Sequence, residues 1–247
     1  MSRSFRLSHV AAIATLAAAG VSSHAATVSV TVAGTSNPYL AGMPDGSTTG
    51  SDQAPAQSPV QVPGSLAGGA LTFTNAAGGV SRAPGCVGAC NPIDGNEFWD
   101  HSYGAVHGIS DMRAPIESLV GVFLDASQPD SSAAPSALDF QTLGLDFLNL
   151  APELKQVFFI GDGLTSANVV QQFAVPTGAT RLYLAVWDGY GWYNNSGAIT
   201  IDVNGVQLDA GTVPEPSTAA LLALGVGAIL ALRRRTRLQD RLLQAAH

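Results

Sequence analysis

One stretch near the end of the central region decides the fold class, and it reads Ile199-Thr200-Ile201-Asp202-Val203-Asn204-Gly205-Val206-Gln207-Leu208. Apolar and polar side chains alternate over Ile199–Val203, which is the period of a strand with one buried face. The dipeptide Asn204-Gly205 favours the two positive φ angles of a type I′ turn. The stretch therefore predicts two antiparallel strands joined by a two-residue hairpin.

Similar sequence extends over residues 27–210. Runs rich in β-branched and aromatic residues are separated by Gly, Pro, Asn and Asp, and no long helical period interrupts them. The other strand candidates are Val28–Ala33, Ala70–Asn75, Leu119–Leu124, Gln156–Ile160 and Leu182–Val186. Two polar stretches, 37–69 and 125–135, are expected to form loops, the first ordered but irregular. Short strands spaced by turns predict a single all-β domain, a β-sandwich or jelly roll.

Charge is unevenly distributed along the 247-residue chain. Seven of the 11 basic residues lie near the two ends, so residues 27–213 hold four basic and 16 acidic residues, a formal net charge of −12. Such a region repels phosphate backbones and attracts cations. Nucleic acid is therefore excluded as a partner. The hydrophobic content of 46% is too high for a wholly disordered chain.

The first 26 residues have the three parts of a secretory signal peptide. Two arginines precede an apolar run at Val10–Val21, and small residues follow it. This order predicts export, with cleavage after Ala25 or Ala26.

Three features follow the β-rich region in a fixed order: the motif Val213-Pro214-Glu215-Pro216-Ser217, the uncharged residues 218–232, and three arginines at 233–235. At about 1.5 Å per residue, a helix over 218–232 would measure about 22 Å, which makes a weak membrane span with snorkelling arginines. Arginines after a span stay in the cytoplasm, and a signal peptide places the preceding domain outside.

This order resembles the PEP-CTERM sorting signal of Gram-negative bacteria that make exopolysaccharide. The resemblance implies that an exosortase, a membrane protease-transpeptidase, recognises Pro214, Glu215 and Pro216. The helix would then be removed, and the domain would be released or attached to the cell envelope. The basic tail 233–247 is longer than such signals usually have. Residues 211–247 are thus predicted to be the sorting signal, with an anchor in the inner membrane during sorting.

The chain has two cysteines, Cys86 and Cys90, close together in the sequence. In an exported protein this spacing predicts a local disulfide. A structural zinc ion would need two more soft ligands, and none is paired nearby. The closed loop is very small, so its stabilising effect should lie toward the low end of the usual range.

The richest cluster of polar and aromatic side chains follows Leu182–Val186 and reads Trp187-Asp188-Gly189-Tyr190-Gly191-Trp192-Tyr193-Asn194-Asn195-Ser196-Gly197. Asp and Asn supply the hard oxygen ligands that calcium prefers, and glycines let carbonyl groups turn inward. Neighbouring aromatic rings suit the apolar face of a sugar. The alternative is an ordinary Gly/Asn turn with core aromatics, and spacing alone favours it.

Together with Gln156-Val157-Phe158-Phe159-Ile160-Gly161-Asp162-Gly163, this loop resembles the LecA-like (PA-IL-like) galactose-binding lectin domain. The resemblance implies one calcium ion that in turn holds sugar hydroxyls. Its ligands would be the side chains of Asp188, Asn194 and Asn195, a backbone carbonyl at Trp192 or Gly191, and a carbonyl near Arg82.

The same resemblance implies a histidine at the sugar site. His101 and His107 are the candidates, and solvent-facing loop histidines are the alternative. Trp192 and Tyr190 would supply aromatic faces for the sugar. Asp162 is a further candidate ligand, although an Asp-Gly turn explains it as well.

The sequence lacks the motifs of serine hydrolases, zinc proteases and phosphate-binding loops, so we predict no enzymatic activity. The leading hypothesis is an exported, exosortase-sorted protein of the envelope or extracellular matrix, whose domain binds carbohydrate with calcium and associates with exopolysaccharide. The alternative is a non-catalytic structural envelope or matrix protein without sugar binding.

Overall fold

The computed structural model describes residues 25–66, 68–82, 84 and 91–207. Within these ranges the chain is mostly β-strand with very little helix, which confirms the all-β prediction. The one α-helix among them, α1 (Phe140–Leu143), is four residues long. The 3-10 helices η1 (Pro38–Leu40), η2 (Pro129–Ser131) and η3 (Trp192–Asn194) have three residues each.

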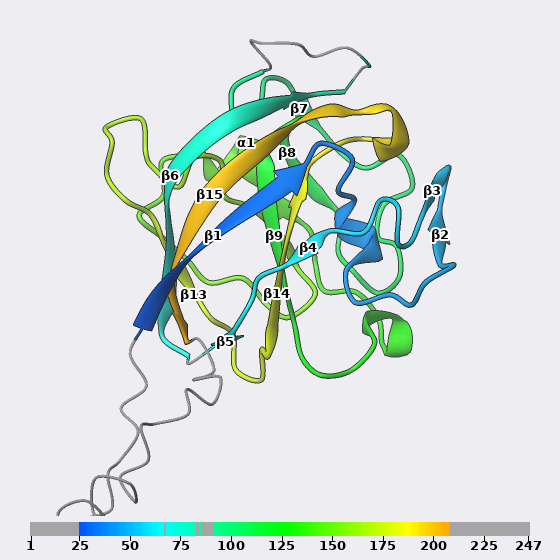
Figure 1. Ribbon diagram of the computed structural model, residues 1–247, viewed down its shortest axis with the longest axis horizontal. Helices are drawn as coiled ribbons and strands as arrows, with labels where there is room; N and C mark the ends of the chain where they lie inside the picture. The colour runs from blue at the N-terminus through cyan, green and yellow to red at the C-terminus, as the bar shows by residue number, and fades with distance from the viewer. Residues whose placement is uncertain (1–24, 67, 83, 85–90, 208–247) are drawn as a thin grey trace, which may run out of the picture.

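The larger sheet is built on three neighbouring strands that curve together in Figure 1. In order, its strands are β1 (Ala25–Ala33), β15 (Ser196–Gln207), β6 (Ala70–Ser81), β13 (Gln172–Ala174) and β11 (Asn149–Leu150), and β5 (Ser65–Leu66) also pairs with β15. Side chains alternate along β1, so Val30 and Val32 are buried while Ser29 and Thr31 are exposed. One face of this sheet is therefore polar and open to solvent.

A second sheet packs against the apolar face of the first. Its strands in order are β12 (Val157–Phe159), β9 (Leu119–Leu124), β14 (Arg181–Val186) and β4 (Val60–Gln61). All six residues of β9 are buried. Leu119 and Phe123 belong to the core between the two sheets, and Val120 and Val122 belong to a second core on the opposite face. The second sheet is thus covered on both sides.

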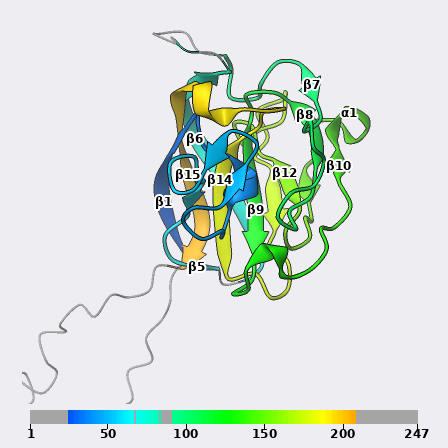
Figure 2. The ribbon, with the colours of Figure 1, turned by 90° about the vertical axis from the view of Figure 1, so that its right-hand side faces the viewer.

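Short elements form the layer that covers the outer face of the second sheet. They include η1, α1, β7 (Phe98–Trp99), β8 (Met112–Pro115) and β10 (Leu138–Asp139), while β2 (Thr48–Thr49) and β3 (Asp52–Gln53) form a small hairpin beside them. Figure 2 shows the layers edge-on, with β1, β15 and β6 on one side, β14 and β9 between, and β8 and β10 on the other.

The predicted hairpin at Asn204-Gly205 is wrong. β15 runs through both residues and keeps its pairing with β1, where Asn204 lies opposite Thr27 and Val206 opposite Ala26. Gly205, at φ +94°, is the extra residue of a β-bulge, and Asn204 has no positive φ. The Asn204 side chain instead accepts a hydrogen bond from Thr27 Oγ1 at 2.7 Å, which holds the two strands together.

Some predictions fall on segments outside the described residues. These are most of the signal peptide (residues 1–24), the Cys86–Cys90 disulfide, and the predicted helix at 218–232. Ala25 and Ala26, the predicted cleavage positions, stand at the start of β1. Within the described ranges, no helix has the length and apolar character needed to cross a bilayer.

Candidate functional site

Four strand ends meet where the predicted loop begins. At the end of β14, Val186 lies opposite Leu119, the first residue of β9. At the start of β15, Ser196 lies opposite Ser81, the last residue of β6. The residues just beyond these ends are Glu117, Asp188 and Asn195 with the backbone of Arg82, and we call them the strand-end cluster.

Asp188 and Asn195 lie together in the interior of the strand-end cluster, with 3% and 7% of their surface exposed. The Asn195 amide nitrogen donates a hydrogen bond to the Gly34 carbonyl at 3.1 Å, and the Asn195 side chain also hydrogen-bonds the Asp188 carboxylate. The Asn195 oxygen Oδ1, although buried, has no hydrogen-bond partner. A buried acceptor of this kind requires a specific explanation, because nearly all such groups in proteins are paired.

Glu117 is the member of the cluster that the sequence analysis missed. Only 3% of its surface is exposed, and its backbone has the uncommon φ of +74°. Its Oε1 accepts a hydrogen bond from the Arg82 backbone N–H at 2.6 Å, and its Oε2 accepts one from Asn96 Nδ2 at 3.1 Å. Its own N–H donates to the Trp187 carbonyl at 2.7 Å, which places Glu117 beside Asp188. A strained backbone fixed by this many bonds is typical of functional sites.

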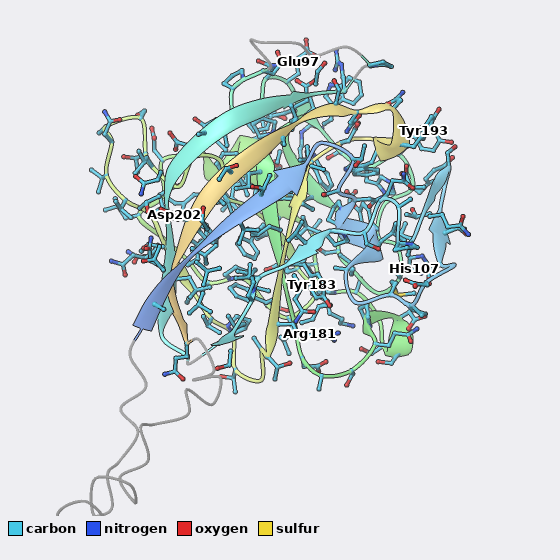
Figure 3. All side chains as sticks on the ribbon, in the orientation of Figure 1. Glu97, His107, Arg181, Tyr183, Tyr193 and Asp202 are labelled. Carbon is cyan, nitrogen blue, oxygen red and sulfur yellow. The ribbon has the colours of Figure 1, made fainter. Side chains whose placement is uncertain are left out.

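A cavity of about 430 Å³ opens beside Glu117. Glu97 stands at the upper edge of the molecule in Figure 3 and lines this cavity. The other residues that line it are Ser81, Arg82, Asn91, Asn96, Ile116 and Glu117. The walls are mostly polar, so the strand-end cluster borders a space that water or a hydrated ion can enter.

Glu117 and Asp188 are two buried carboxylates close to each other, and their negative charges repel. Burial raises the pKa of Asp188, and the nearby charge of Glu117 raises it further, while the hydrogen bond from Asn195 lowers it. Within the described ranges, neither carboxylate forms a salt bridge. The Arg82 guanidinium lies over the Trp99 ring at 4.8 Å and 4.0 Å from Glu97. A cation close to Glu117 and Asp188 would therefore be stabilised.

The structure brings together three of the five predicted calcium ligands, namely Asp188, Asn195 and the backbone of Arg82. Asn194 is exposed, and the Trp192 carbonyl accepts a hydrogen bond from the Asn195 N–H at 3.0 Å. Among the described residues, no group of three or more His, Cys, Asp and Glu side chains converges as a metal site. Calcium differs from transition metals in also accepting amide and carbonyl oxygens.

A third buried carboxylate, Asp52, holds the loop in its shape. Asp52 is 2% exposed and comes from β3, far from the loop in sequence. Its oxygens accept hydrogen bonds from the backbone N–H groups of Trp192 at 3.2 Å and Tyr193 at 2.7 Å, and from Asn37 Nδ2 at 3.0 Å. Nothing in the sequence near Asp52 indicates this role.

The predicted sugar-binding residues divide between interior and surface. Trp192 is 1% exposed and donates its indole N–H to the Val186 carbonyl at 2.7 Å. His101 is 4% exposed and stacks on Tyr39 with ring centroids 4.2 Å apart. A sugar-stacking role requires an exposed ring face, which Trp192 and His101 do not have. Both rings instead stabilise the folded domain by being buried, which removes their apolar surface from water.

Tyr190 and His107 remain at the surface. Tyr190 is 44% exposed. The His107 Nε2 lies 3.0 Å from the Thr48 carbonyl, which ties it to β2, and Figure 3 shows it on the same side of the molecule as Tyr193. Asp162 accepts a hydrogen bond from the Leu164 N–H at 2.8 Å, as the Asp-Gly turn interpretation expects.

Comparison with known proteins identifies the C-terminal segment. Residues 212–235 match the family described as the PEP-CTERM protein-sorting motif. The chain carries a PEP-CTERM sorting motif. The match includes the predicted recognition residues Pro214, Glu215 and Pro216, and it implies an exported protein that exosortase sorts and that is anchored to the membrane at its C-terminus. No curated protein and no solved structure matches the chain, so the lectin resemblance gains no support from them.

Proposed function

We propose that the exported domain of this PEP-CTERM protein binds calcium at the strand-end cluster and, with calcium bound, binds carbohydrate of the cell's exopolysaccharide. Asp188, Glu117 and Asn195 would hold the ion through side-chain oxygens, with the Arg82 carbonyl as a further donor. The ion would supply the positive charge that the two carboxylates lack. The protein has no catalytic role in this proposal.

The observation that carries the calcium proposal is the unpartnered Oδ1 of Asn195. A buried acceptor without a partner is unfavourable by about 1–3 kcal/mol. The Asn195 amide nitrogen already donates to the Gly34 carbonyl and to the Asp188 carboxylate. Flipping the amide would therefore turn Oδ1 toward these two acceptors, which is unfavourable. A cation held between Asp188 and Asn195 would give this oxygen a partner.

The chemistry of the donors selects calcium over other metals. All candidate ligands are oxygens, from carboxylate, amide and carbonyl groups, and calcium takes six to eight such ligands including water. Zinc and copper prefer histidine and cysteine, neither of which belongs to the cluster. The net charge of −12 over residues 27–213 raises the local concentration of any divalent cation.

Carbohydrate binding draws its support from three further features. The PEP-CTERM motif implies an exported, membrane-anchored protein, the loop resembles that of a galactose-binding lectin, and exposed aromatic side chains flank the cluster. Because Asp188 and Asn195 are nearly fully buried, an ion held there would order the loop rather than contact a sugar directly. The loop's exposed side chains would make the sugar contacts.

A structural envelope protein is the second candidate function, and the burial of the cluster is the observation that favours it. An ion held between β6, β9, β14 and β15 would fasten four strand ends whatever the loop binds. In this case calcium stabilises the domain and no carbohydrate binds. Titrations with calcium and then with polysaccharide separate the two functions.

Isothermal titration of the exported protein with calcium tests the site. We expect heat of binding and a higher melting temperature at millimolar calcium. Asp188→Asn should weaken calcium binding by about tenfold or more, because it removes a formal charge at nearly constant shape. Asn195→Ala should weaken it as well, whereas Asn194→Ala, at an exposed neighbour, should not. An absence of both heat and thermal stabilisation would refute the calcium site.

A further inference from the structure

We infer that four exposed aromatic side chains beside the strand-end cluster form the carbohydrate-binding surface, and that its ligand is a neutral polysaccharide. These side chains are Trp99, Tyr103, Tyr190 and Tyr193, and we call them the aromatic surface. The inference rests on the proposed function, for which it names the contact residues and the class of ligand.

The aromatic surface is distinguished by its exposure. Its members are 39%, 61%, 44% and 53% exposed for Trp99, Tyr103, Tyr190 and Tyr193. All the strongly exposed aromatic side chains in the described part of the chain belong to this set. Large apolar groups gathered at one place on a surface commonly mark a binding site, whereas scattered ones do not.

Two loops build the surface and hold it in shape. The Ser102 N–H donates to the Gly189 carbonyl at 2.9 Å, and the Trp187 indole N–H donates to the Trp99 carbonyl at 3.0 Å. A Cβ on Gly189 would lie 2.8 Å from the Trp99 ring, so only glycine lets that ring pack against the loop. The rings are therefore positioned before any ligand arrives, which lowers the entropy lost on binding.

Tyr103 and Tyr190 form the centre of the surface. Their ring centroids are 5.6 Å apart in an edge-to-face arrangement, and their hydroxyl groups interact through a hydrogen bond. The Tyr190 hydroxyl also lies 3.0 Å from Ser51 Oγ. The pair thus offers aromatic faces and hydroxyl groups together, and a pyranose has a matching apolar face and a rim of hydroxyls.

The aromatic surface is connected to the strand-end cluster by a short piece of backbone. The Tyr190 N–H donates to the Asp188 carboxylate at 3.3 Å, and Asn195 closes η3 one residue after Asn194. An ion that fixes Asp188 and Asn195 would fix both ends of the segment that carries Tyr190 and Tyr193. This connection accounts for calcium dependence without a direct contact between ion and sugar.

The position of the surface argues against a membrane as its ligand. The loop precedes the start of β15, and the last residue of β15, Gln207, lies opposite Ala25 at the other end of the sheet. The eleven steps between the twelve residues of β15, at about 3.3 Å each, extend at most about 36 Å. Gln207 is the last described residue before the sorting motif at 212–235, so the chain leaves the described domain toward the motif at the end opposite the aromatic surface. Figure 3 shows Tyr193 far from the C-terminal end of β15.

Charge narrows the class of polysaccharide. Residues 27–213 carry a net charge of −12, and Arg82, whose guanidinium lies over the Trp99 ring, also lies 4.0 Å from Glu97. A uronic acid polymer would be repelled by this domain, whereas a neutral polymer of hexoses would not. Stacking and hydroxyl contacts need no charge on the ligand.

Affinity electrophoresis of the exported protein through gels containing galactomannan, with alginate as the anionic comparison, tests the inference. In saturating calcium, galactomannan should retard the protein and alginate should not. Tyr103→Ala and Tyr190→Ala should each weaken the affinity about five- to tenfold, while Tyr190→Phe should stay within about twofold because its ring face remains. Leu148→Ala serves as the control, since Leu148 is 54% exposed outside the surface.

Calcium titration and melting temperature of the same variants separate the possible failures. If calcium binds but the Tyr103→Ala/Tyr190→Ala double variant binds galactomannan like the parent, the aromatic surface is refuted and the proposed function stands. Retardation by alginate alone, or capture of a protein partner without any polysaccharide binding, also overturns the inference. If galactomannan binds through the tyrosines but calcium does not bind, the inference holds and the calcium proposal fails.

Discussion

Replacement of Asp52 by alanine is the sharpest test of how the loop is held. The Asp52 carboxylate comes from the small β2–β3 hairpin, yet it accepts hydrogen bonds from two consecutive backbone N–H groups of η3 and from the Asn37 amide. It therefore ties three segments together that are far apart in sequence. Alanine at this position leaves each of these donors without its acceptor.

The size of the effect follows from burial. Trp192 and Asn37 are 1% and 0% exposed, so water cannot replace the lost acceptor, and a buried unsatisfied group is unfavourable by about 1–3 kcal/mol. Tyr193 is 53% exposed, so water can replace part of its bond. We expect Asp52→Ala to lower the free energy of unfolding by about 3–5 kcal/mol, which in a domain of this size lowers the melting temperature by about 10 °C.

Urea unfolding followed by tryptophan fluorescence measures this change, because Trp187 and Trp192 are both buried beside the loop. Asp130→Ala provides the control, since Asp130 is exposed and accepts a hydrogen bond from the neighbouring Gln128 side chain. The control should change the free energy of unfolding by less than about 0.5 kcal/mol. A loss below about 1 kcal/mol in Asp52→Ala would show that the loop keeps its shape without the carboxylate.

Three further predictions concern sorting, pH and the bulge. Mass spectrometry of the exported protein should find no residues 218–235, and Glu215→Ala should retain them; an unprocessed parent protein would contradict sorting at the motif. Burial lowers the pKa of His101 in the folded domain, although the charges of Asp111 and Asp52 oppose this shift. The neutral His101 ring therefore contributes its full stability above the pKa of the unfolded chain, near 6.5, and this contribution is lost as the pH falls through the lower pKa of the folded domain. Relative to His101→Phe, the parent should therefore lose melting temperature between pH 7.5 and 5, and a constant difference would argue against a buried neutral ring. Gly205→Ala should destabilise by about 1–2 kcal/mol in thermal unfolding, because φ is +94° and a Cβ would lie 3.0 Å from the Ala70 carbonyl; a neutral result would mean that the bulge can relax.

The buried strands could be predicted from the sequence because their signal is local. The candidate Leu119–Leu124 coincides with β9, a run that is apolar because both of its faces are covered. The hairpin prediction was wrong because the outcome at Asn204-Gly205 depends on residues far away in the sequence. A positive φ at Gly205 suits either a turn or a bulge, and the choice is made by β1 and β5, which pair with Val206 and Gln207 beyond the dipeptide.

The strand-end cluster was only partly predictable. Asp188 and Asn195 belong to one short loop, and the resemblance to the lectin loop, rather than spacing alone, made both of them candidate ligands. Glu117 comes from the turn before β9 and Asp52 from β3, and only the tertiary structure brings them to the loop. A single acidic residue at the start of a strand carries no local signal that distinguishes a buried partner from a solvated side chain.

The orientation of the loop's aromatic side chains could not be predicted from the sequence either. In an extended strand, Tyr190 and Trp192 would face the same side, because side chains alternate with a period of two. Gly191 instead adopts a left-handed conformation at φ +78° and starts η3. Trp192 consequently turns into the core, and Tyr190 and Tyr193 remain exposed. Gly191 thus decides which rings of the loop are available to a ligand, and it explains why Tyr190 and Tyr193, rather than Trp192, belong to the aromatic surface.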